Sequence, residues 1–296
     1  MQKFILSTDS TCDLYAGFIK ENDIKFVSLT YTVEDKAGNI TDGLDAFTDY
    51  SQYVDFYNML RDGSLSRTSM LNYESHMAHF TALAKEGAED VVHFTISSGL
   101  SPTVTVAEKA AAEVKKSYPE FNVYAIDSLS ATIGQGALVR AALRMRNEGK
   151  TAAETAEYVK ALRFKIQYMI AANDLNYLRR GGRVSSVAAV AGTMLGIKPI
   201  LTFSREGKLV VADKVRGMKR AFALALEKME KYPPSDEHGF FWIVHTDAEE
   251  DAHKLADMVE EKYGRRPDIS IMGPVIGSHV GPGAVAIIWK SDIERN

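Results

Sequence analysis

The sequence predicts an α/β protein with two domains, and three observations lead to that prediction. The chain has 296 residues, of which 46% are hydrophobic and 25% are charged, which suits a globular protein of this size. In residues 1–163, short apolar runs alternate with helical patterns, as in a parallel sheet covered by helices on both faces. In residues 164–296, hairpins and helices predict an α+β domain with a mixed or antiparallel sheet.

In the first domain, we expect strands and helices to follow one another in turn. Strands are expected at residues 4–6, 25–29, 91–96 and 123–126, and helices from about residue 13 and at 53–60, 73–86, 102–116, 131–146 and 152–162. Ser101 and Pro102 favour a helix start, as N-cap and first helical residue. Residues 34–49 form a polar excursion between elements, and residues 63–69 are expected to be a loop.

In the second domain, the order of elements is different. Strands are expected at residues 168–172, 240–245, 269–272 and 285–289, a hairpin at 199–203 and 209–212, and helices at 175–178, 186–195, 218–230 and 249–263. Ser185 is the expected N-cap of the helix at 186–195. Pro233 and Pro234 end the helix that precedes them.

Charge and cysteine content exclude several classes of protein. The net charge is −4 and there is no long basic run, which argues against a nucleic-acid partner. The single cysteine, Cys12, cannot form an internal disulfide and fits a reducing cytosol. The first residues turn polar too soon for a signal peptide, and no apolar run is long enough to cross a bilayer. We therefore expect a cytoplasmic protein without an integral membrane segment.

Hydroxyl side chains gather where the predicted strands of the first domain end. In parallel sheets, ligands bind at the carboxyl ends of the strands. Six of these hydroxyls follow a strand directly, namely Ser7, Thr8, Ser10, Ser97, Ser98 and Ser128. Thr68 and Ser69 lie just before a helix. Any one of them alone is explained as a helix cap, but four separate turns with the same chemistry favour a site for a carboxylate or phosphate head group.

Residues 277–284 are the most distinctive stretch of the second domain. They contain three glycines and a proline around His279, between two predicted strands. This composition predicts a tight loop that presents one imidazole to a small ligand. A plain connecting turn with an exposed histidine is the alternative.

Several familiar catalytic and metal-binding patterns are absent from the sequence. There is no phosphate-binding G-x-x-x-x-G-K-[ST] loop, no G-x-G-x-x-G after a strand, no G-x-S-x-G elbow and no zinc-spaced Cys/His cluster. Asp9, Asp13 and Asp127 have magnesium-binding chemistry, but we interpret them as cap or turn residues. We therefore expect neither a catalytic residue nor a metal site.

Seven motifs, in order along the whole chain, carry a family resemblance. They are Ser7 to Leu14, Arg67-Thr68-Ser69, Ile96 to Ser101, Asp127-Ser128 with Gly134-Gln135-Gly136, Leu178 to Arg183, Gly196 to Leu201, and Gly277 to Gly283. Together they resemble the DegV family, bacterial fatty-acid-binding proteins that present acyl chains to a fatty-acid kinase. The resemblance implies a DegV-like protein with a Rossmann-like N-terminal sheet and a fatty acid, such as palmitate or oleate, buried between two domains.

The same resemblance implies roles for particular residues. Thr68 and Ser98 would hold the carboxylate, with Ser69 and Ser97 beside them. His279 would lie near the head group, and Arg216 would belong to a surface that faces the kinase. No cofactor other than the bound fatty acid is implied, and the chemistry would belong to the kinase, so this chain would not be an enzyme.

The sequence departs from the family pattern at two places. Met70-Leu71 stands where the family usually has Gln-Pro, which affects the shape of the pocket beside the head group. Pro102 stands where the family usually has glycine, and it keeps a good helix start.

Burial of the chain would supply most of the affinity for such a ligand. At about 0.8 kcal/mol per CH₂, fourteen methylenes contribute on the order of 11 kcal/mol relative to water. Small residues at 187–192 would leave room for the chain, or simply allow close helix packing. Two other functions stay open, a phosphotransferase, because the domain plan resembles a subunit of dihydroxyacetone kinases, and a small-ligand sensor.

Overall fold

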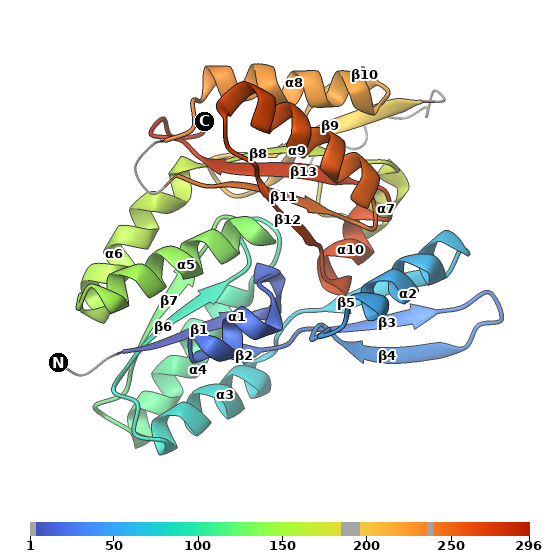
Figure 1. Ribbon diagram of the computed structural model, residues 1–296. Coiled ribbons are helices and arrows are strands. Elements are labelled where there is room, and N and C mark those ends of the chain that lie inside the picture. Colours follow the sequence, from blue (N-terminus) through green and yellow to red (C-terminus); the bar gives the residue numbers. More distant parts are fainter. Residues whose placement is uncertain (1–3, 185–195, 236–238) are drawn as a thin grey trace.

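The computed structural model describes residues 4–184, 196–235 and 239–296, and it has two lobes, each built on its own sheet (Figure 1). The N-terminal lobe contains β1 (Ile5–Asp9), the 3₁₀ helix η1 (Ser10–Cys12), α1 (Ala16–Glu21), β2 (Ile24–Val27), β3 (Thr30–Glu34), β4 (Ile40–Leu44), α2 (Tyr50–Arg61), β5 (Leu65–Ser69), α3 (Tyr73–Lys85), β6 (Asp90–Thr95), α4 (Thr103–Ser117), β7 (Asn122–Asp127), α5 (Ile133–Asn147) and α6 (Ala152–Leu162). The C-terminal lobe contains η2 (Arg163–Lys165), β8 (Ile166–Ala171), α7 (Leu175–Gly181), β9 (Ile197–Phe203), β10 (Leu209–Arg216), α8 (Met218–Lys231), β11 (Phe241–His245), α9 (Glu249–Tyr263), β12 (Asp268–Ile271), α10 (Pro274–Val280) and β13 (Val285–Lys290).

The N-terminal sheet is parallel, as predicted. Its strand order is β2-β1-β6-β7. Helices α3 and α4 cover one face, where Phe80, Val114 and Phe121 are buried against the sheet (Figure 1). Helices α5 and α6 cover the other face and lie between the two lobes (Figure 1).

The C-terminal sheet is mixed and mainly antiparallel, also as predicted. Its order is β10-β9-β8-β13-β11-β12, and β11 and β12 are its parallel pair among the described strands. Every residue of β13 is buried because the strand lies in the middle of the sheet. Helices α8 and α9 cover the outer face, and α9 buries Ala252, Leu255, Ala256 and Val259 at helical spacing.

One hydrophobic core joins the two lobes. It contains Leu6 and Phe94 from the first sheet, Leu138 from α5, and Ile170 and Ile288 from the second sheet. Because α5 is buried on the side of both sheets, the lobes share packing across their boundary.

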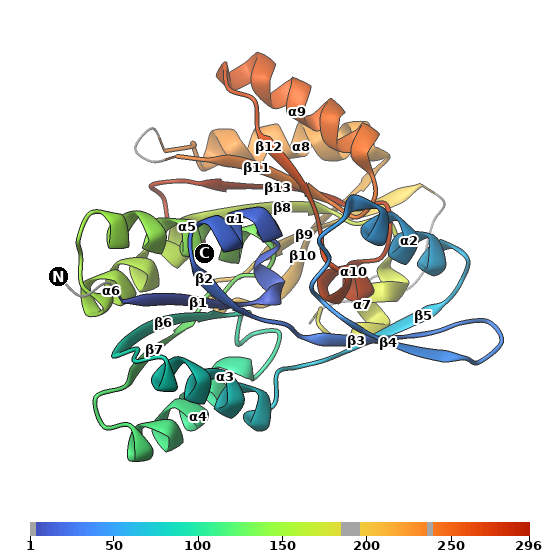
Figure 2. The ribbon, with the colours of Figure 1, turned by 60° about the horizontal axis from the view of Figure 1, so that its bottom comes forward.

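The N-terminal lobe has a second, smaller sheet, which the sequence did not predict. Strands β4-β3-β5 form an antiparallel sheet that extends away from the main body (Figure 2). Residues 34–49 contain half of its hairpin, and residues 63–69, predicted to be a loop, contain β5. The polar composition hid these strands, since only Tyr31 and Val33 of β3 are buried, against Phe56 of α2.

The structure corrects three further boundaries. Strand β1 continues to Asp9, so Ser7 and Thr8 lie within it. Helix α4 begins at Thr103, and the Ser101 hydroxyl contacts Thr103 Oγ1 at 2.8 Å instead of capping the helix. Residues up to Val280 of the predicted tight loop are helical, because Pro274 occupies the first turn of α10. The predicted helix at 186–195 and its cap Ser185 lie outside the described residues.

Cys12 lies in η1 and is completely buried. Burial raises the pKa of its thiol.

Asp9 and Asp127 have the cap and turn roles expected for them. Asp9 accepts the Thr11 N–H at 3.1 Å, and Asp127 accepts the Leu129 N–H at 3.0 Å.

Candidate functional site

A cavity of about 500 Å³ lies where the two lobes and β5 meet. This volume is within the range of small-molecule sites. Most of its wall is apolar, formed by Leu29, Met70, Ile96, Leu100, Pro102, Ala131, Ile170, Leu178, Phe203, Leu209, Met272, Val275, Ile276 and Val280. Its polar groups are Thr68, Ser69, Asn72, Ser101, Thr132, Arg183 and His279. The cavity therefore suits a ligand with a long apolar part and one polar end.

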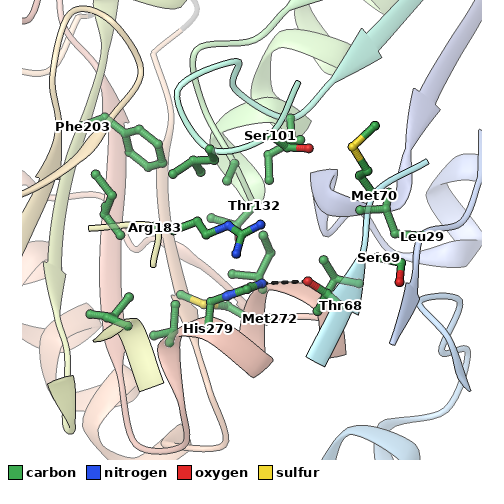
Figure 3. Close-up of a pocket in the computed structure, with 18 of the residues that line it drawn as sticks. Leu29, Thr68, Ser69, Met70, Ser101, Thr132, Arg183, Phe203, Met272 and His279 are labelled. Atoms are coloured by element: carbon green, nitrogen blue, oxygen red, sulfur yellow. Dashed lines mark hydrogen bonds between the residues drawn. The ribbon is translucent and has the colours of Figure 1, made fainter. Parts of the chain in front are cut away.

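The polar end of the cavity is built by β5 and the last turn of α10. Ser66 and Thr68 are two residues apart on β5, so their side chains point to the same side of the strand. Ser66 Oγ lies 2.6 Å from Ser278 Oγ, and Thr68 Oγ1 lies 2.8 Å from His279 Nε2 (Figure 3). These two pairs fix the strand and the helix relative to each other, so Thr68 and His279 form one wall.

His279 is neutral at physiological pH in this environment. Burial, reinforced by the charge of Arg183, lowers the pKa of its imidazole to about 4. One ring nitrogen is engaged with Thr68, while Nδ1 is buried and has no hydrogen-bond partner among the described residues. The pair thus has unused hydrogen-bonding capacity that a bound polar group can satisfy.

Gly181, the last residue of α7, allows His279 to occupy this position. A Cβ at residue 181 would collide with His279 Nδ1 and lie 3.3 Å from its Cγ. The glycine is therefore required by close approach rather than by its backbone conformation.

Among the described residues that line the cavity, Arg183 is the one cation. It follows α7, and its guanidinium reaches into the cavity near the Thr68–His279 pair (Figure 3). Arg183 also donates to the carbonyl of Gly181. It therefore brings a positive charge to the polar end of an otherwise apolar cavity.

Thr132 also lines the cavity and has a strained backbone. Its φ of 51° and ψ of −147° are unfavourable for a residue with a side chain. Its carbonyl accepts hydrogen bonds from two N–H groups in the first turn of α5, that of Gln135 at 2.9 Å and that of Gly136 at 3.1 Å. The first turn of α5 thus holds Thr132 in the wall.

Not all residues of the predicted head-group site come together. Thr68, Ser69 and His279 line the cavity, but Ser97 and Ser98 do not. Ser97 Oγ donates to the carbonyl of Gly207 at 2.7 Å. Ser98 is exposed, and its backbone N–H donates to Asp127 Oδ1 at 3.0 Å. The predicted pairing of Ser98 with Thr68 is therefore not found in this structure, although neighbouring residues of the same loop line the cavity.

Most of the other hydroxyls at strand ends have structural partners. Ser7 Oγ lies 2.7 Å from His79 Nε2 and 2.9 Å from His93 Nδ1. Ser10 Oγ accepts the N–H of Leu29, and Ser128 Oγ donates to the carbonyl of Ser130. Each of these hydroxyls therefore has a partner within the protein, in a histidine side chain or in the backbone, and Ser7, Ser10 and Ser128 are not among the residues that line the cavity.

Arg216 lies apart from the cavity. It is the last residue of β10 and is exposed.

Three residues that line the cavity were not predicted as site residues, namely Arg183, Thr132 and Ser101. Arg183 belongs to one of the seven sequence motifs, and a charged residue directly after paired glycines was the signal that pointed to it.

The described part of the chain offers no cluster of three or more His, Cys, Asp or Glu side chains that could hold a metal ion. Among the described helices, none is both long enough and apolar enough to cross a membrane. The cavity between the lobes is the candidate site.

Comparison with known proteins agrees with this architecture. A family model described as "Uncharacterised protein, DegV family" matches residues 3–292. The chain belongs to the DegV family. A DegV domain-containing protein of Clostridium perfringens is 33% identical over 297 residues and covers all of both chains.

Solved structures of DegV proteins share the whole fold. A DegV lipid-binding protein of Thermotoga maritima superposes with a TM-score of 0.84 at 28% identity, over all of both chains. A DegV family protein of Thermus thermophilus, described by its fatty-acid binding, has a TM-score of 0.82 at 27% identity and covers 98% of this chain and 100% of its own. The parallel N-terminal sheet and the mixed C-terminal sheet are thus DegV features.

Proposed function

We propose that this DegV protein binds a long-chain fatty acid, such as palmitate or oleate, in the cavity between the lobes. The observation that carries the proposal is a mainly apolar cavity of about 500 Å³ whose polar end holds Thr68, His279 and Arg183. The apolar wall would bury the acyl chain, at about 0.8 kcal/mol per CH₂ relative to water. The DegV relatives of Thermotoga maritima and Thermus thermophilus, which are described as lipid-binding and fatty-acid-binding, support this assignment.

The carboxylate would sit at the Thr68–His279 pair, with Ser69 beside it. A buried carboxylate is costly unless it accepts hydrogen bonds. The Thr68 hydroxyl and the neutral imidazole of His279 have two donor protons, one of which is used in their mutual hydrogen bond, so the pair can donate one hydrogen bond to the carboxylate. Arg183 supplies the opposite charge. Ser98, and Ser97 beside it, remain predicted contributors that a small movement of their loop would have to bring in.

The protein would act as a carrier, with no catalytic residue of its own. In this proposal a separate fatty-acid kinase phosphorylates the carboxylate. One carboxylate oxygen forms a bond to the phosphorus of the donor, and the bond from that phosphorus to its leaving oxygen breaks. Exposed Arg216 would contribute to the kinase-facing surface. We propose residues 1–163 and 164–296 as the two domains between which the ligand lies.

Native mass spectrometry of the purified protein, followed by organic extraction, tests the proposal. We expect one long-chain fatty acid per chain, and a delipidated protein that takes up palmitate more tightly than octanoate because each lost CH₂ weakens binding. A protein that is empty and takes up neither palmitate nor oleate would contradict fatty-acid binding.

The carrier role has its own test, separate from binding. Loaded protein with a nucleotide triphosphate and Mg²⁺ should form acyl phosphate only after a fatty-acid kinase is added. Turnover by the isolated chain would favour a phosphotransferase instead, and failure to bind any such kinase would favour a small-ligand sensor.

A further inference from the structure

A separate cavity of about 170 Å³ lies where η1, α1 and the segment after β4 meet the beginning of α10. None of its described lining residues lines the cavity between the lobes. Three of them, Ala16, Ala46 and Thr48, are exposed, so the cavity is open to solvent. We call it the acidic cavity, because Asp13 and Asp45 line it.

The two carboxylates of the acidic cavity lie side by side. Asp13 follows η1, and Asp45 follows β4 and is only 5% exposed. A Cβ added to Gly273 would lie 2.6 Å from Asp45 Oδ1 and 2.9 Å from Asp13 Oδ1. Both carboxylates therefore reach the same point at the start of α10.

Each carboxylate has a buried oxygen that the protein leaves unused. Asp13 Oδ1 accepts the N–H of Gly273 at 2.9 Å. The second oxygen, Oδ2, is buried in both Asp13 and Asp45 and has no hydrogen-bond partner among the described residues. A buried polar atom without a partner is rare and costly, and a bound donor would satisfy both oxygens at once.

The negative charge of this pair is not balanced by the described part of the chain. None of the described lining residues is Lys, Arg or His, and neither Asp13 nor Asp45 forms an ion pair there. Burial raises the pKa of the Asp13 carboxyl to about 7, and burial together with the charge of Asp13 raises that of Asp45 well above its ordinary value. A cation bound between them would stabilise both ionised forms.

The rest of the wall indicates which kind of cation fits. It is mainly apolar and aromatic, with Leu14, Ile19, Phe26, Phe47 and Tyr53. Ca²⁺ requires about six to eight oxygen ligands and Mg²⁺ keeps several waters, which apolar side chains cannot hydrogen-bond. An ammonium group instead offers N–H donors to carboxylates, is attracted to aromatic faces, and can bury an alkyl stem against the apolar wall.

We propose that the acidic cavity binds a small primary alkylamine in its ammonium form. The charged nitrogen would lie between Asp13 and Asp45, and the alkyl stem would lie against the aromatic side chains. The site is separate from the proposed fatty-acid site and does not depend on it.

Titration with n-butylammonium at pH 8 tests the inference. Like the side chain of lysine, this ligand is a cation at pH 8, and n-butanol is its neutral counterpart of similar shape. The NMR shift of the Gly273 amide, which contacts Asp13, measures binding at the site. Wild type is compared with Asp45→Asn. Asp42→Asn is the matched control, because Asp42 is an exposed acid of β4 that does not line the cavity.

We expect a saturable shift with n-butylammonium and none with n-butanol. Asp45→Asn should weaken n-butylammonium binding at least about tenfold, because a charge-assisted hydrogen bond to the ligand is lost. Asp42→Asn should stay within about twofold of wild type, since exposed charges contribute little. Thermal melting verifies that each variant folds, and Asp13→Asn, with the same expected loss, replaces Asp45→Asn if that variant does not.

Several outcomes would overturn the inference. No saturable binding to the wild type would mean that the carboxyls are protonated or hydrated instead. Equal binding of n-butanol would mean that only the apolar wall binds ligands, and equal losses in Asp42→Asn and Asp45→Asn would indicate a general attraction of cations. A shift of the Gly273 amide with Mg²⁺ but not with n-butylammonium would make the cavity a metal site.

Discussion

Two side-chain contacts join β5 to α10. Thr68 contacts His279, and the neighbouring pair Ser66 and Ser278 contact each other through their hydroxyls. The two contacts work together, since removal of either loosens the element that carries the other. At the scale of single residues, the site is therefore defined by hydrogen bonds across two elements far apart in the sequence.

Thr68→Val tests the head-group assignment with little change in shape. The variant loses the hydroxyl that contacts His279 Nε2. We expect palmitate affinity to fall roughly ten- to hundredfold, because a hydrogen bond to a charged group contributes about 1.5–3 kcal/mol. Displacement of a fluorescent fatty acid measures this, and affinity within twofold of wild type would remove Thr68 from the site.

Ser98→Ala provides a comparison within the same assay. In the structure its side chain is exposed and outside the cavity, while its backbone N–H donates to Asp127. If the loop stays in place, we expect less than a threefold change in palmitate affinity. A loss as large as that of Thr68→Val would establish that the loop moves when the ligand binds.

Gly181→Ala should damage binding without a large loss of stability. The added methyl group collides with the His279 ring and displaces it from Thr68. We expect at least a tenfold loss of palmitate affinity. Gly17→Ala is the matched control, because it has open space in α1 and should leave affinity unchanged. Wild-type affinity in Gly181→Ala would mean that the position of His279 is not needed.

Sequence reasoning could find Thr68, Ser69 and His279 as residues of one site, because the motifs that contain them keep their order along the chain. It could not find the direction of the Ser97 and Ser98 side chains. That direction depends on Gly207 and Asp127, which are distant in sequence or belong to another strand end. Arg183 was missed because its position depends on where α7 ends.

At the scale of elements, α10 is held at both ends by the N-terminal lobe. At its beginning, Asp13 Oδ1 accepts the N–H of Gly273 at 2.9 Å, and the Tyr57 hydroxyl donates to the Met272 carbonyl at 2.7 Å. At its end, β5 contacts Ser278 and His279. The position of α10 therefore depends on how the two lobes lie relative to each other.

Asp13→Asn should change stability in a pH-dependent manner. Burial raises the pKa of the Asp13 carboxyl to about 7, from an ordinary value of about 3.9. Between these values the folded chain binds a proton that the unfolded chain releases, so this carboxyl lowers the free energy of unfolding as the pH rises from 4 to 7. Asparagine keeps an acceptor for Gly273 without the charge.

We therefore expect Asp13→Asn to melt at a higher temperature than wild type at pH 8 and at a similar temperature at pH 4.5. The gain in unfolding free energy at pH 8 should be a few kcal/mol at most, since three pKa units correspond to about 4 kcal/mol. Thermal melting across this pH range measures the difference. A difference in melting temperature that is the same at both pH values would contradict the assignment.

The sequence indicated the long helices and buried strands well, but it missed β3, β4, β5 and α10. The long elements have clear apolar periodicity, as in α9. Strand β5 has none, because its alternate residues Ser66 and Thr68 face a polar contact instead of a core. Helix α10 has only seven residues, contains Gly277 and lies between Gly273 and Gly281. So short a helix depends on tertiary contacts, which the local composition does not reveal.

At the scale of the whole molecule, three histidines lie between α3 and the parallel sheet, where His76 and His93 are buried and His79 is partly buried. The His93 ring contacts two imidazoles of α3: His76 edge to face, with ring centroids 5.4 Å apart, and His79 in a tilted arrangement at 5.8 Å. Burial lowers the pKa of His76 and of His79 to about 4 and that of His93 well below its ordinary value. Both ring nitrogens of His76 lack a partner among the described residues.

This cluster predicts loss of stability in mild acid. Below pH 6.5 the unfolded chain protonates these imidazoles while the folded chain does not, so the free energy of unfolding falls as the pH drops from 6.5 to 4. Each histidine contributes at most about 1.4 kcal/mol per pH unit. His76→Phe, which keeps the stacking on Phe80 at 5.6 Å, should flatten this dependence.

Urea unfolding at pH 7.5, 5.5 and 4.5 measures the effect. The variant and wild type should diverge as the pH falls, with the variant becoming relatively more stable. A difference between variant and wild type that is the same at all three pH values would show that folding does not shift the pKa of His76, and it would overturn the prediction.

The two-lobe plan was predictable because each half of the chain has a different order of strands and helices. The shared core was not, since Leu138 of α5 shows no sequence feature that distinguishes packing against one sheet from packing between two. Lobes that share a core are expected to unfold together rather than separately.

The single cysteine of the chain, Cys12, is buried, which has a practical consequence for following ligand binding. Because Cys12 is inaccessible and its thiol stays protonated, thiol-reactive dyes should leave the native protein unlabelled. One cysteine introduced at exposed Met70, at the rim of the cavity, would then be the only reactive thiol of the chain. A fluorophore at that position would report entry and exit of the ligand in real time without any need to remove a native cysteine.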